Sequence, residues 1–313
     1  MTSKTVIEPA AAPAIDPMPS DGIRIEPGPS HVVLDSPHSG TSYPGDFRHA
    51  CDPLQLRQAE DTFVEALWGF APALGATLIH ALFPRSYIDV NRALDEIDDS
   101  MFDEPWPGLK RPGSKVALGK GLVWRALDDG TPLYDRKLSV PEVQARINRC
   151  WMPYHGILAR TIDGLSRHHR QLIHLNCHSM PSMAGAFSTE FPGMAHPDIV
   201  LGDRDGTTAD PRLTRAIGRF FEARGYSVAI NHPYKGVEIV RRYGGPEARR
   251  HSIQVELNRR LYMDERALVP HAGYLPLRNT LRALLVALLA LDLRAGEVPD
   301  SITGERPAAA LMT

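Results

Sequence analysis

Cysteine is scarce in this chain, and long apolar runs are missing from it. Its three cysteines, Cys51, Cys150 and Cys177, cannot all pair within one chain, which argues against a disulfide-stabilised secreted scaffold. The longest apolar run, residues 283–291, is far shorter than the roughly 20 residues that span a bilayer. The N-terminal residues contain no continuous apolar core of a secretory signal. We therefore expect a cytoplasmic protein that has no membrane partner.

The chain also lacks an excess of either charge. With 35 Lys and Arg against 37 Asp and Glu, the formal net charge is −2, so no basic footprint predicts a nucleic-acid partner.

The chain's 313 residues are ample for one large domain with a buried core. The Pro/Ala bias near the start predicts a flexible tail. We expect tails over 1–29 and 299–313, one catalytic domain over 30–298, and a monomer or small homo-oligomer.

Strand and helix patterns alternate along the chain. The predicted strands cover residues 31–37, 76–83, 86–92, 173–178, 198–203, 226–231 and 251–258. The predicted helices cover 52–75, with Asp52 as N-cap, 140–170, with a kink at Pro153, 210–225, and the region from about Pro276. Residues 95–140 predict loops with short strands. This order favours an α/β fold, with a mixed, largely parallel sheet flanked by helices on both faces.

Polar residues gather where several predicted strands end. His38 follows the strand at 31–37, His178 closes the strand that contains Cys177, and Asn91–Arg92 and Glu256 occupy two further strands. Ligands of such sheets bind at the carboxyl ends of strands. Glu60 and Asp61 lie nearby in the first helix pattern. Two imidazoles and a carboxylate suit zinc, which keeps an open position for water in catalytic sites.

Structural interpretations compete with each of these assignments. A histidine at a strand end is more often a hydrogen-bonded structural group than a ligand, and an acidic residue in a helix usually faces solvent. Cys177 and His178 are neighbours in a strand and face opposite sides, so Cys177 is better read as a small buried residue than as a nucleophile. The cations Arg204, Lys235 and Arg241 lie in turns or charged pairs that are commonly surface features.

A set of separated motifs carries a family resemblance over residues 30–265. In order along the chain they are SPHSG, EDTFVEALW, FPRSYIDVNRALDEID, PYH, CHSMPS, VLGDRDGT, NHPYKGVEIVRRYGGP and QVELNRRLYMDE. Together they resemble the N-formylglutamate amidohydrolase family. That resemblance implies a fold like that of the zinc carboxypeptidases and aspartoacylases, and it implies one Zn²⁺ per chain, although other divalent metals are possible. Histidine degradation is the family's common setting.

The resemblance also implies roles for individual residues. The metal ligands would be His38, Asp61 and His178. The carboxypeptidase group takes a glutamate three residues after its first histidine, where this chain has Thr41, so Asp61 is the matching carboxylate and Glu60 the fallback. The catalytic residues would be Glu256, as general base, and Arg85, at the scissile carbonyl. Asn91 and Arg92 would bind the α-carboxylate of the substrate, and Arg204, Lys235 or Arg241 a second carboxylate.

Asn176 departs from the family pattern. The family often has Asp two residues before the second histidine, and an Asp there can orient a ligand imidazole. The expected function is zinc-dependent hydrolysis of N-formyl-L-glutamate to formate and L-glutamate. The alternatives are the same chemistry on another N-acyl amino acid, such as N-formyl- or N-acetylaspartate, and a binding protein that has lost catalysis.

Overall fold

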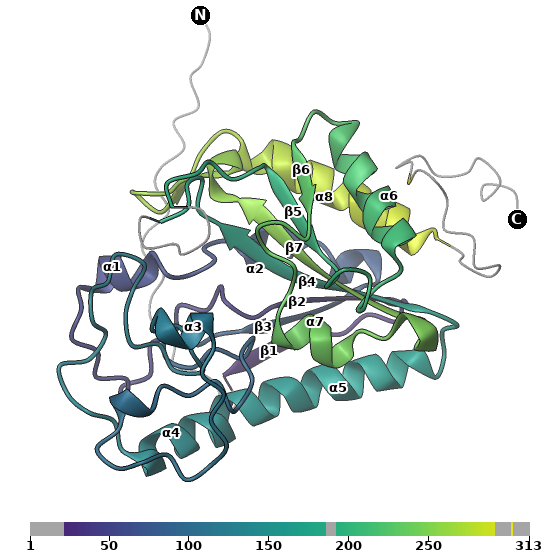
Figure 1. Ribbon diagram of the computed structural model, residues 1–313. Coiled ribbons are helices and arrows are strands. Elements are labelled where there is room, and N and C mark those ends of the chain that lie inside the picture. Colours follow the sequence, from purple (N-terminus) through teal and green to yellow (C-terminus); the bar gives the residue numbers. More distant parts are fainter. Residues whose placement is uncertain (1–21, 186–191, 292–301, 303–313) are drawn as a thin grey trace, which may run out of the picture.

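The strand predicted around residue 175 lies at the centre of a seven-stranded sheet. The computed structural model describes residues 22–185, 192–291 and 302. In these residues the strand order is β1-β3-β2-β4-β7-β5-β6. Strands β3, β2, β4 and β7 are parallel, whereas β1 pairs antiparallel with β3, and β5 antiparallel with β7. The strands are Ile23–Glu26 (β1), Val32–Ser36 (β2), Thr77–Ala81 (β3), Leu172–Met180 (β4), Ile199–Gly202 (β5), Val228–Ile230 (β6) and Arg250–Asn258 (β7) (Figure 1).

Helices cover both faces of this sheet (Figure 1). Val64–Trp68 (α2), Pro211–Glu222 (α6) and Tyr274–Leu289 (α8) pack on one face. Met152–Ser166 (α5) and Glu238–Tyr243 (α7) pack on the other. The predicted fold class, a mixed and largely parallel sheet between helices, is therefore confirmed. The remaining elements are Pro53–Arg57 (α1), Ser114–Ala117 (α3), Val140–Arg146 (α4) and a separate hairpin of Met263–Asp264 (β8) and Val269–Pro270 (β9).

Alternation along β4 sorts its side chains between the two faces. All nine residues of β4 are buried. Leu175 and Cys177 belong to the apolar core shared with α2, α6 and α8, which confirms that Cys177 is a buried small residue. The side chains of His174, Asn176 and His178 face the other way and form hydrogen bonds with polar neighbours. One face of β4 thus stabilises the fold, and the other carries polar groups.

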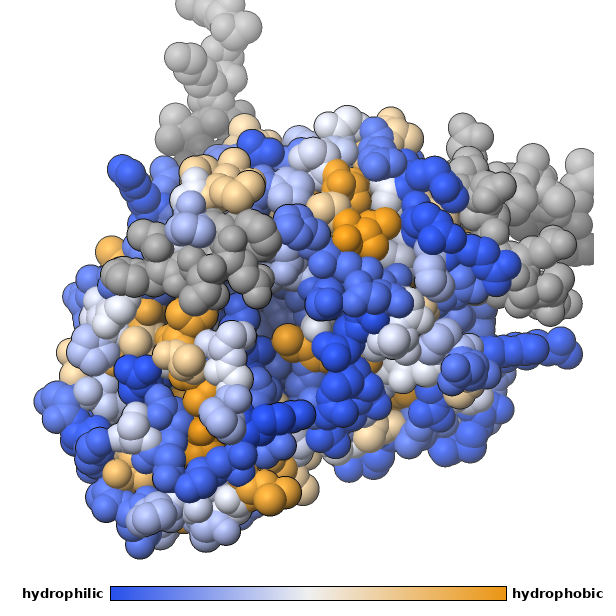
Figure 2. Space-filling view, viewed as in Figure 1, coloured by the Kyte–Doolittle hydropathy of each residue, from blue (hydrophilic) through white to orange (hydrophobic). Residues whose placement is uncertain are grey.

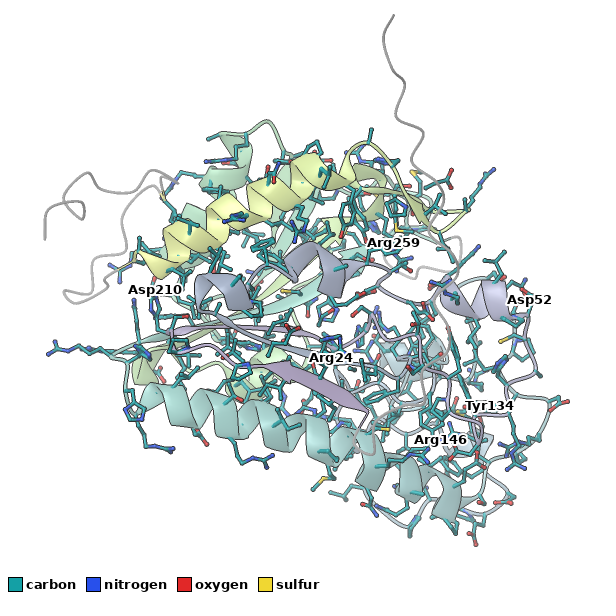
Figure 3. The ribbon with its side chains drawn as sticks, turned by 180° about the vertical axis from the view of Figure 1, so that it is seen from behind. Arg24, Asp52, Tyr134, Arg146, Asp210 and Arg259 are labelled. Atoms are coloured by element: carbon teal, nitrogen blue, oxygen red, sulfur yellow. The ribbon has the colours of Figure 1, made fainter. Side chains whose placement is uncertain are left out.

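The helix predicted over residues 52–75 is interrupted. Asp52 (labelled in Figure 3) caps α1 by accepting from the backbone N–H groups of Leu54 and Gln55, as predicted. The helical bonds then give way to tertiary ones. The Asp61 N–H donates to the carbonyl of His38, 3.0 Å away, and the Arg259 guanidinium donates to the carbonyl of Glu60, 2.6 Å away. Local sequence periodicity cannot encode these distant partners, so the single helix was the wrong prediction.

Residues 86–92 form turns and not the predicted strand. The Tyr87 N–H donates to the carbonyl of Pro84, and the Arg92 N–H donates to the carbonyl of Asp89. The segment is almost entirely buried, which explains its apolar pattern. The pattern indicated burial correctly, but burial alone does not distinguish a strand from a packed loop.

The long irregular segment at 95–140 is anchored by a buried cation. Arg146 is fully buried at the end of α4 and donates to the Tyr134 hydroxyl at 2.7 Å and to the Tyr87 carbonyl at 3.0 Å. Arg146 and Tyr134 are labelled close together in Figure 3. The segment is largely loop, as predicted, but in place of the predicted short strands its described residues contain α3, a 3₁₀ turn at Asp99–Met101 and isolated bridges.

The helical region is divided just before Pro153, as predicted. A π turn at Ile147–Trp151 separates α4 from α5, and Pro153 lies in the first turn of α5. The expected N-terminal tail is too long, since residues 23–26 pair with β3 as β1. Its first 21 residues lie outside the described part of the chain, as does the expected C-terminal tail apart from Ile302. No helix in the described part is both long and apolar enough to cross a bilayer.

Candidate metal centre

Three side chains from separate elements meet at the carboxyl ends of β2 and β4. His38 follows β2, His178 belongs to β4, and Asp61 lies in the break between α1 and α2. Each offers one ligand atom, and these atoms lie within 4.8 Å of one another. Asp61 Oδ2 lies 3.5 Å from Nδ1 of His38 and 2.9 Å from Nδ1 of His178. The fold thus brings together the three residues predicted as ligands.

Both imidazoles present the same nitrogen to Asp61 and use the other one elsewhere. Nε2 of His38 lies 2.7 Å from Asp89 Oδ1, and Nε2 of His178 lies 2.8 Å from Asn176 Oδ1. Nδ1 of His38 is buried and has no hydrogen-bond partner in the described residues. A buried ring nitrogen without a partner is costly, and a cation at that place would satisfy it.

Asp61, and not its neighbour, is the carboxylate that faces the histidines. The carboxylate of Glu60 contacts Tyr43 and Arg57 instead. Burial alone raises the pKa of Asp61, but its contacts with His178 and His38 and the charge of Arg85 outweigh it, so the pKa lies well below its usual value. Asp61 is therefore ionised at neutral pH, as a metal ligand must be.

Arg85 and Glu256 complete the centre. Arg85 lies 3.4 Å from Asp61 Oδ1 and 3.2 Å from Asp89 Oδ2, with its guanidinium over the Trp124 ring. Glu256 sits on β7 directly opposite His178, and its Oε1 accepts from Gln254 Nε2 at 2.7 Å. Burial is the largest cause that raises the pKa of Glu256 above its usual value. The centre therefore combines a candidate cation site, a fixed guanidinium and a buried carboxylate.

Comparisons with known proteins show which family the chain resembles. The family model for N-formylglutamate amidohydrolase matches residues 30–263. N-formylglutamate deformylase from Pseudomonas putida is 31% identical over 266 residues, which are 83% of this chain and 92% of that protein. The Pseudomonas aeruginosa deformylase is 30% identical with the same coverage. The crystal structure of N-formylglutamate amidohydrolase from Ralstonia eutropha JMP134 matches at a TM-score of 0.82 and 43% identity, covering 86% of this chain and 97% of that one.

This chain belongs to the N-formylglutamate amidohydrolase family. It is accordingly a hydrolase that acts on amide bonds.

The predicted substrate-binding pair lies beside the centre of this amidohydrolase. Asn91 Nδ2 is 3.2 Å from His178 Nε2, while its Oδ1 accepts from the backbone N–H of Ile239 at 2.9 Å. The guanidinium of Arg92 is buried and donates to the carbonyls of Lys120 and Asn91. Asn91 therefore ties the centre to the start of α7, and both side chains are held by the fold.

The other predicted cations are spread over the surface around the amidohydrolase centre. Because β5 runs antiparallel to β7, the segment that follows it, with Arg204, leads toward the amino end of β7. Lys235 is 58% exposed and pairs with Asp205, while Arg241 is 49% exposed and pairs with Glu238. Figure 2 shows a largely hydrophilic face with a hollow near its centre. In the structure Arg204 bonds to the carbonyl of Gly236, so each of the three cations has a partner outside the ligand set.

Sequence reasoning missed two charged residues of the centre. Asp89 is fully buried, and its Oδ1 accepts from the His38 ring, with its Oδ2 near Arg85 and Trp124 Nε1. The signal available was an acidic residue inside an apolar run that also contains Asn91. Arg259 (labelled in Figure 3) follows β7 and lies 3.4 Å from Asp61 Oδ1. It was overlooked because it lies in a dibasic segment typical of protein surfaces.

Proposed function

We propose that this amidohydrolase is a zinc-dependent deformylase, which hydrolyses N-formyl-L-glutamate to formate and L-glutamate. One observation carries the proposal. The ligand atoms of His38, Asp61 and His178 converge beside Glu256, in a chain whose curated relatives are named N-formylglutamate deformylase. The named relatives support the substrate, and the site geometry supports the metal.

The donor set suits zinc. Two neutral imidazole nitrogens and one carboxylate oxygen are a common ligand set of catalytic zinc sites, and the partnerless Nδ1 of His38 is the atom that a cation would satisfy. A bound zinc ion supplies Lewis acidity, which polarises a carbonyl and lowers the pKa of a bound water. In this assignment His38 and His178 act through Nδ1, and Asp61 acts through Oδ2.

Glu256 is the general base in this proposal. It is buried on β7 opposite His178, and its raised pKa suits a group that takes a proton from water and later returns it to the departing amine. We assign the proton transfer to Oε2, because Oε1 accepts from Gln254. Arg85 lies among Asp61, Asp89 and Trp124, and its fixed guanidinium stabilises negative charge on the formyl oxygen.

Arg92 is the group we assign to the α-carboxylate of the substrate, with Asn91 beside it. A guanidinium matches the geometry of a carboxylate, and the buried position of Arg92 strengthens such a contact. For the second carboxylate we favour Arg241 over Arg204 and Lys235. Arg241 belongs to α7, whose first turn is bonded to Asn91 through Ile239.

Formate release from a panel of N-acyl amino acids tests the substrate assignment. We expect the highest kcat/KM with N-formyl-L-glutamate, followed by N-formyl-L-aspartate and then the N-acetyl compounds. A clear preference for an aspartate derivative would replace the proposed substrate. An absence of any turnover by protein that carries stoichiometric zinc would favour a binding protein. The cytoplasmic location and the role in histidine degradation stay predictions.

A further inference from the structure

The two histidines of the centre are supported in different ways. Nε2 of His38 faces a carboxylate, that of Asp89. Nε2 of His178 faces the neutral amide of Asn176. An amide can present either its carbonyl oxygen or its NH₂ group to a ring nitrogen, so Asn176 by itself does not decide which His178 nitrogen carries a proton.

The proton must reside on Nε2 if Nδ1 is to bind a cation. Two neighbours oppose this. Asp61 Oδ2 lies 2.9 Å from Nδ1 and attracts a proton there. Asn91 directs its NH₂ group at Nε2 from 3.2 Å, because its oxygen is occupied by the backbone N–H of Ile239. Among the described residues, the carbonyl of Asn176, 2.8 Å from Nε2, is the group placed to accept a hydrogen bond from that nitrogen.

Asp35 fixes the orientation of the Asn176 amide. It lies directly opposite Asn176 in the β2–β4 register, and its Oδ1 is 2.9 Å from Asn176 Nδ2. A carboxylate accepts hydrogen bonds and donates none, so it holds the NH₂ group and turns the oxygen toward His178. Its ionised form is secured by contacts with His174 Nε2 at 2.8 Å and the Tyr154 hydroxyl at 2.6 Å.

The burial of Asp35 and its neighbours excludes a second role for Asp35 in a hydrolytic triad. Ser252 Oγ, His174 and Asp35 form a series with 2.8 Å contacts, which has the composition of a hydrolytic triad. All three residues are fully buried between β2, β4 and β7, so no substrate reaches the serine. The series holds Asp35 in place, and the contact of Asp35 that leads to the centre is the one with Asn176.

We infer that Asp35 is a positioning residue, which acts through Asn176 to keep the proton of His178 on Nε2 and so leaves Nδ1 to a divalent cation. This inference rests on the proposed metal function of the centre. The family often has Asp at the position of Asn176. In this chain the carboxylate that orients the second histidine is instead that of Asp35, on the neighbouring strand, and Asn176 links the two residues.

Zinc affinity of the apoprotein, measured by competition with a chromophoric chelator, tests the inference. Asp35→Asn keeps the shape but frees the Asn176 amide to turn, and we expect the zinc Kd to rise about 10- to 100-fold. Tyr154→Phe is the matched control. It removes another hydrogen bond from the same carboxylate without touching Asn176, so the Kd should stay within about threefold of the parent value. Equal losses in both variants would overturn the inference.

The exchanged pair, Asp35→Asn with Asn176→Asp, provides a rescue. The carboxylate that the exchange places at position 176 then accepts from His178 Nε2 and from the amide at position 35. His174 Nε2 can also accept from that amide, because the His174 proton can move to Nδ1 and be donated to the Ser252 hydroxyl. We expect a Kd within about threefold of the parent. A double variant that folds, as circular dichroism reports, but binds zinc as poorly as Asp35→Asn would contradict the relay.

A spectrum of the unaltered protein tests the inference even if no variant folds. Long-range ¹⁵N–¹H correlation of the zinc-loaded protein, with His178 assigned through His178→Gln, should show a protonated Nε2 and a metal-bound Nδ1. A protonated Nδ1 with Nε2 on the metal would overturn the relay. Failure of the unaltered apoprotein to bind zinc would instead refute the proposed function, so the two failures are distinguishable.

Discussion

The floor and the rim of this site hold charge in opposite ways. The floor consists of His38, Asp61, Asp89, His178 and Glu256, all buried and joined to fixed partners. The rim consists of Arg204, Lys235 and Arg241, which bond to exposed loops or to nearby acidic residues. Exposed ion pairs contribute little free energy, so the rim can exchange partners easily, whereas the floor cannot. We therefore expect chemistry to depend on the floor, and substrate choice to depend on Arg241, the rim cation whose helix is bonded to Asn91.

Glu256→Gln should have the largest effect on the floor. The amide keeps the shape but cannot take a proton from water, so we expect kcat to fall about 10²- to 10⁴-fold. Zinc content should not change, because Glu256 is not one of the proposed ligands. Formate release and metal analysis of the same preparation measure both quantities. Glu247→Gln, at an exposed position, is the control. Retained turnover would remove Glu256 from the mechanism.

Asp89→Asn should weaken the other side of the floor. The variant replaces the charged acceptor of His38 Nε2 with a neutral amide, while Arg85 and Trp124 keep a polar neighbour. We expect zinc affinity to fall about 10- to 100-fold. Chelator competition measures it. An unchanged affinity would mean that the carboxylate behind His38 serves folding only.

Arg241→Met tests the rim. If Arg241 binds the second carboxylate, the KM for N-formyl-L-glutamate should rise about tenfold. The KM for a substrate that has a neutral side chain should change little. Arg204→Met and Lys235→Met should leave both KM values within about twofold, because their partners lie away from the ligand set. An equal loss with both substrates would show that Arg241 does not distinguish them.

His80→Leu should change stability and leave turnover intact. His80 lies on β3 and is buried, and burial lowers its pKa to about 4. The unfolded chain takes up the proton near pH 6.5 and the folded chain does not. The free energy of unfolding that depends on a neutral His80 is therefore fully present above that pH and is lost as the pH falls toward 4. The loss is on the order of 3 kcal/mol.

Denaturant unfolding at pH 7 and pH 4 measures this dependence. His80→Leu should lose less stability between the two values than the parent does. The exposed His168→Leu variant should follow the parent. If all three proteins show the same pH dependence, His80 does not titrate as its burial implies.

Much of the floor was predictable because alternation within a strand assigns each side chain to a face, and because strands that alternate with helices favour parallel pairing. Alternation along β4 placed Cys177 in the core and His178 on the polar face, and parallel pairing of β2 with β4 brought His38 to the same edge. The position of Asp61 was predicted from the family motifs, but the helix break that places it was not. That break depends on Arg259, about 200 residues further along the chain.

The rim was less predictable, because local sequence does not specify strand direction. The β5 pattern is that of an ordinary buried strand, and its antiparallel pairing with β7 became visible only in the fold. Arg204, one of three candidates for the second carboxylate, follows β5 and therefore lies toward the amino end of β7. Asp89 was missed for a related reason, since a buried acidic residue in a loop has no periodic signature.

Formate release from N-formyl-L-glutamate, followed before chelation, after chelation and after zinc is restored, tests the central claim most directly. If His38, Asp61 and His178 hold the metal on which hydrolysis depends, chelation should abolish the activity, and one equivalent of zinc should restore it. Full activity in protein shown by elemental analysis to contain no metal would contradict the account.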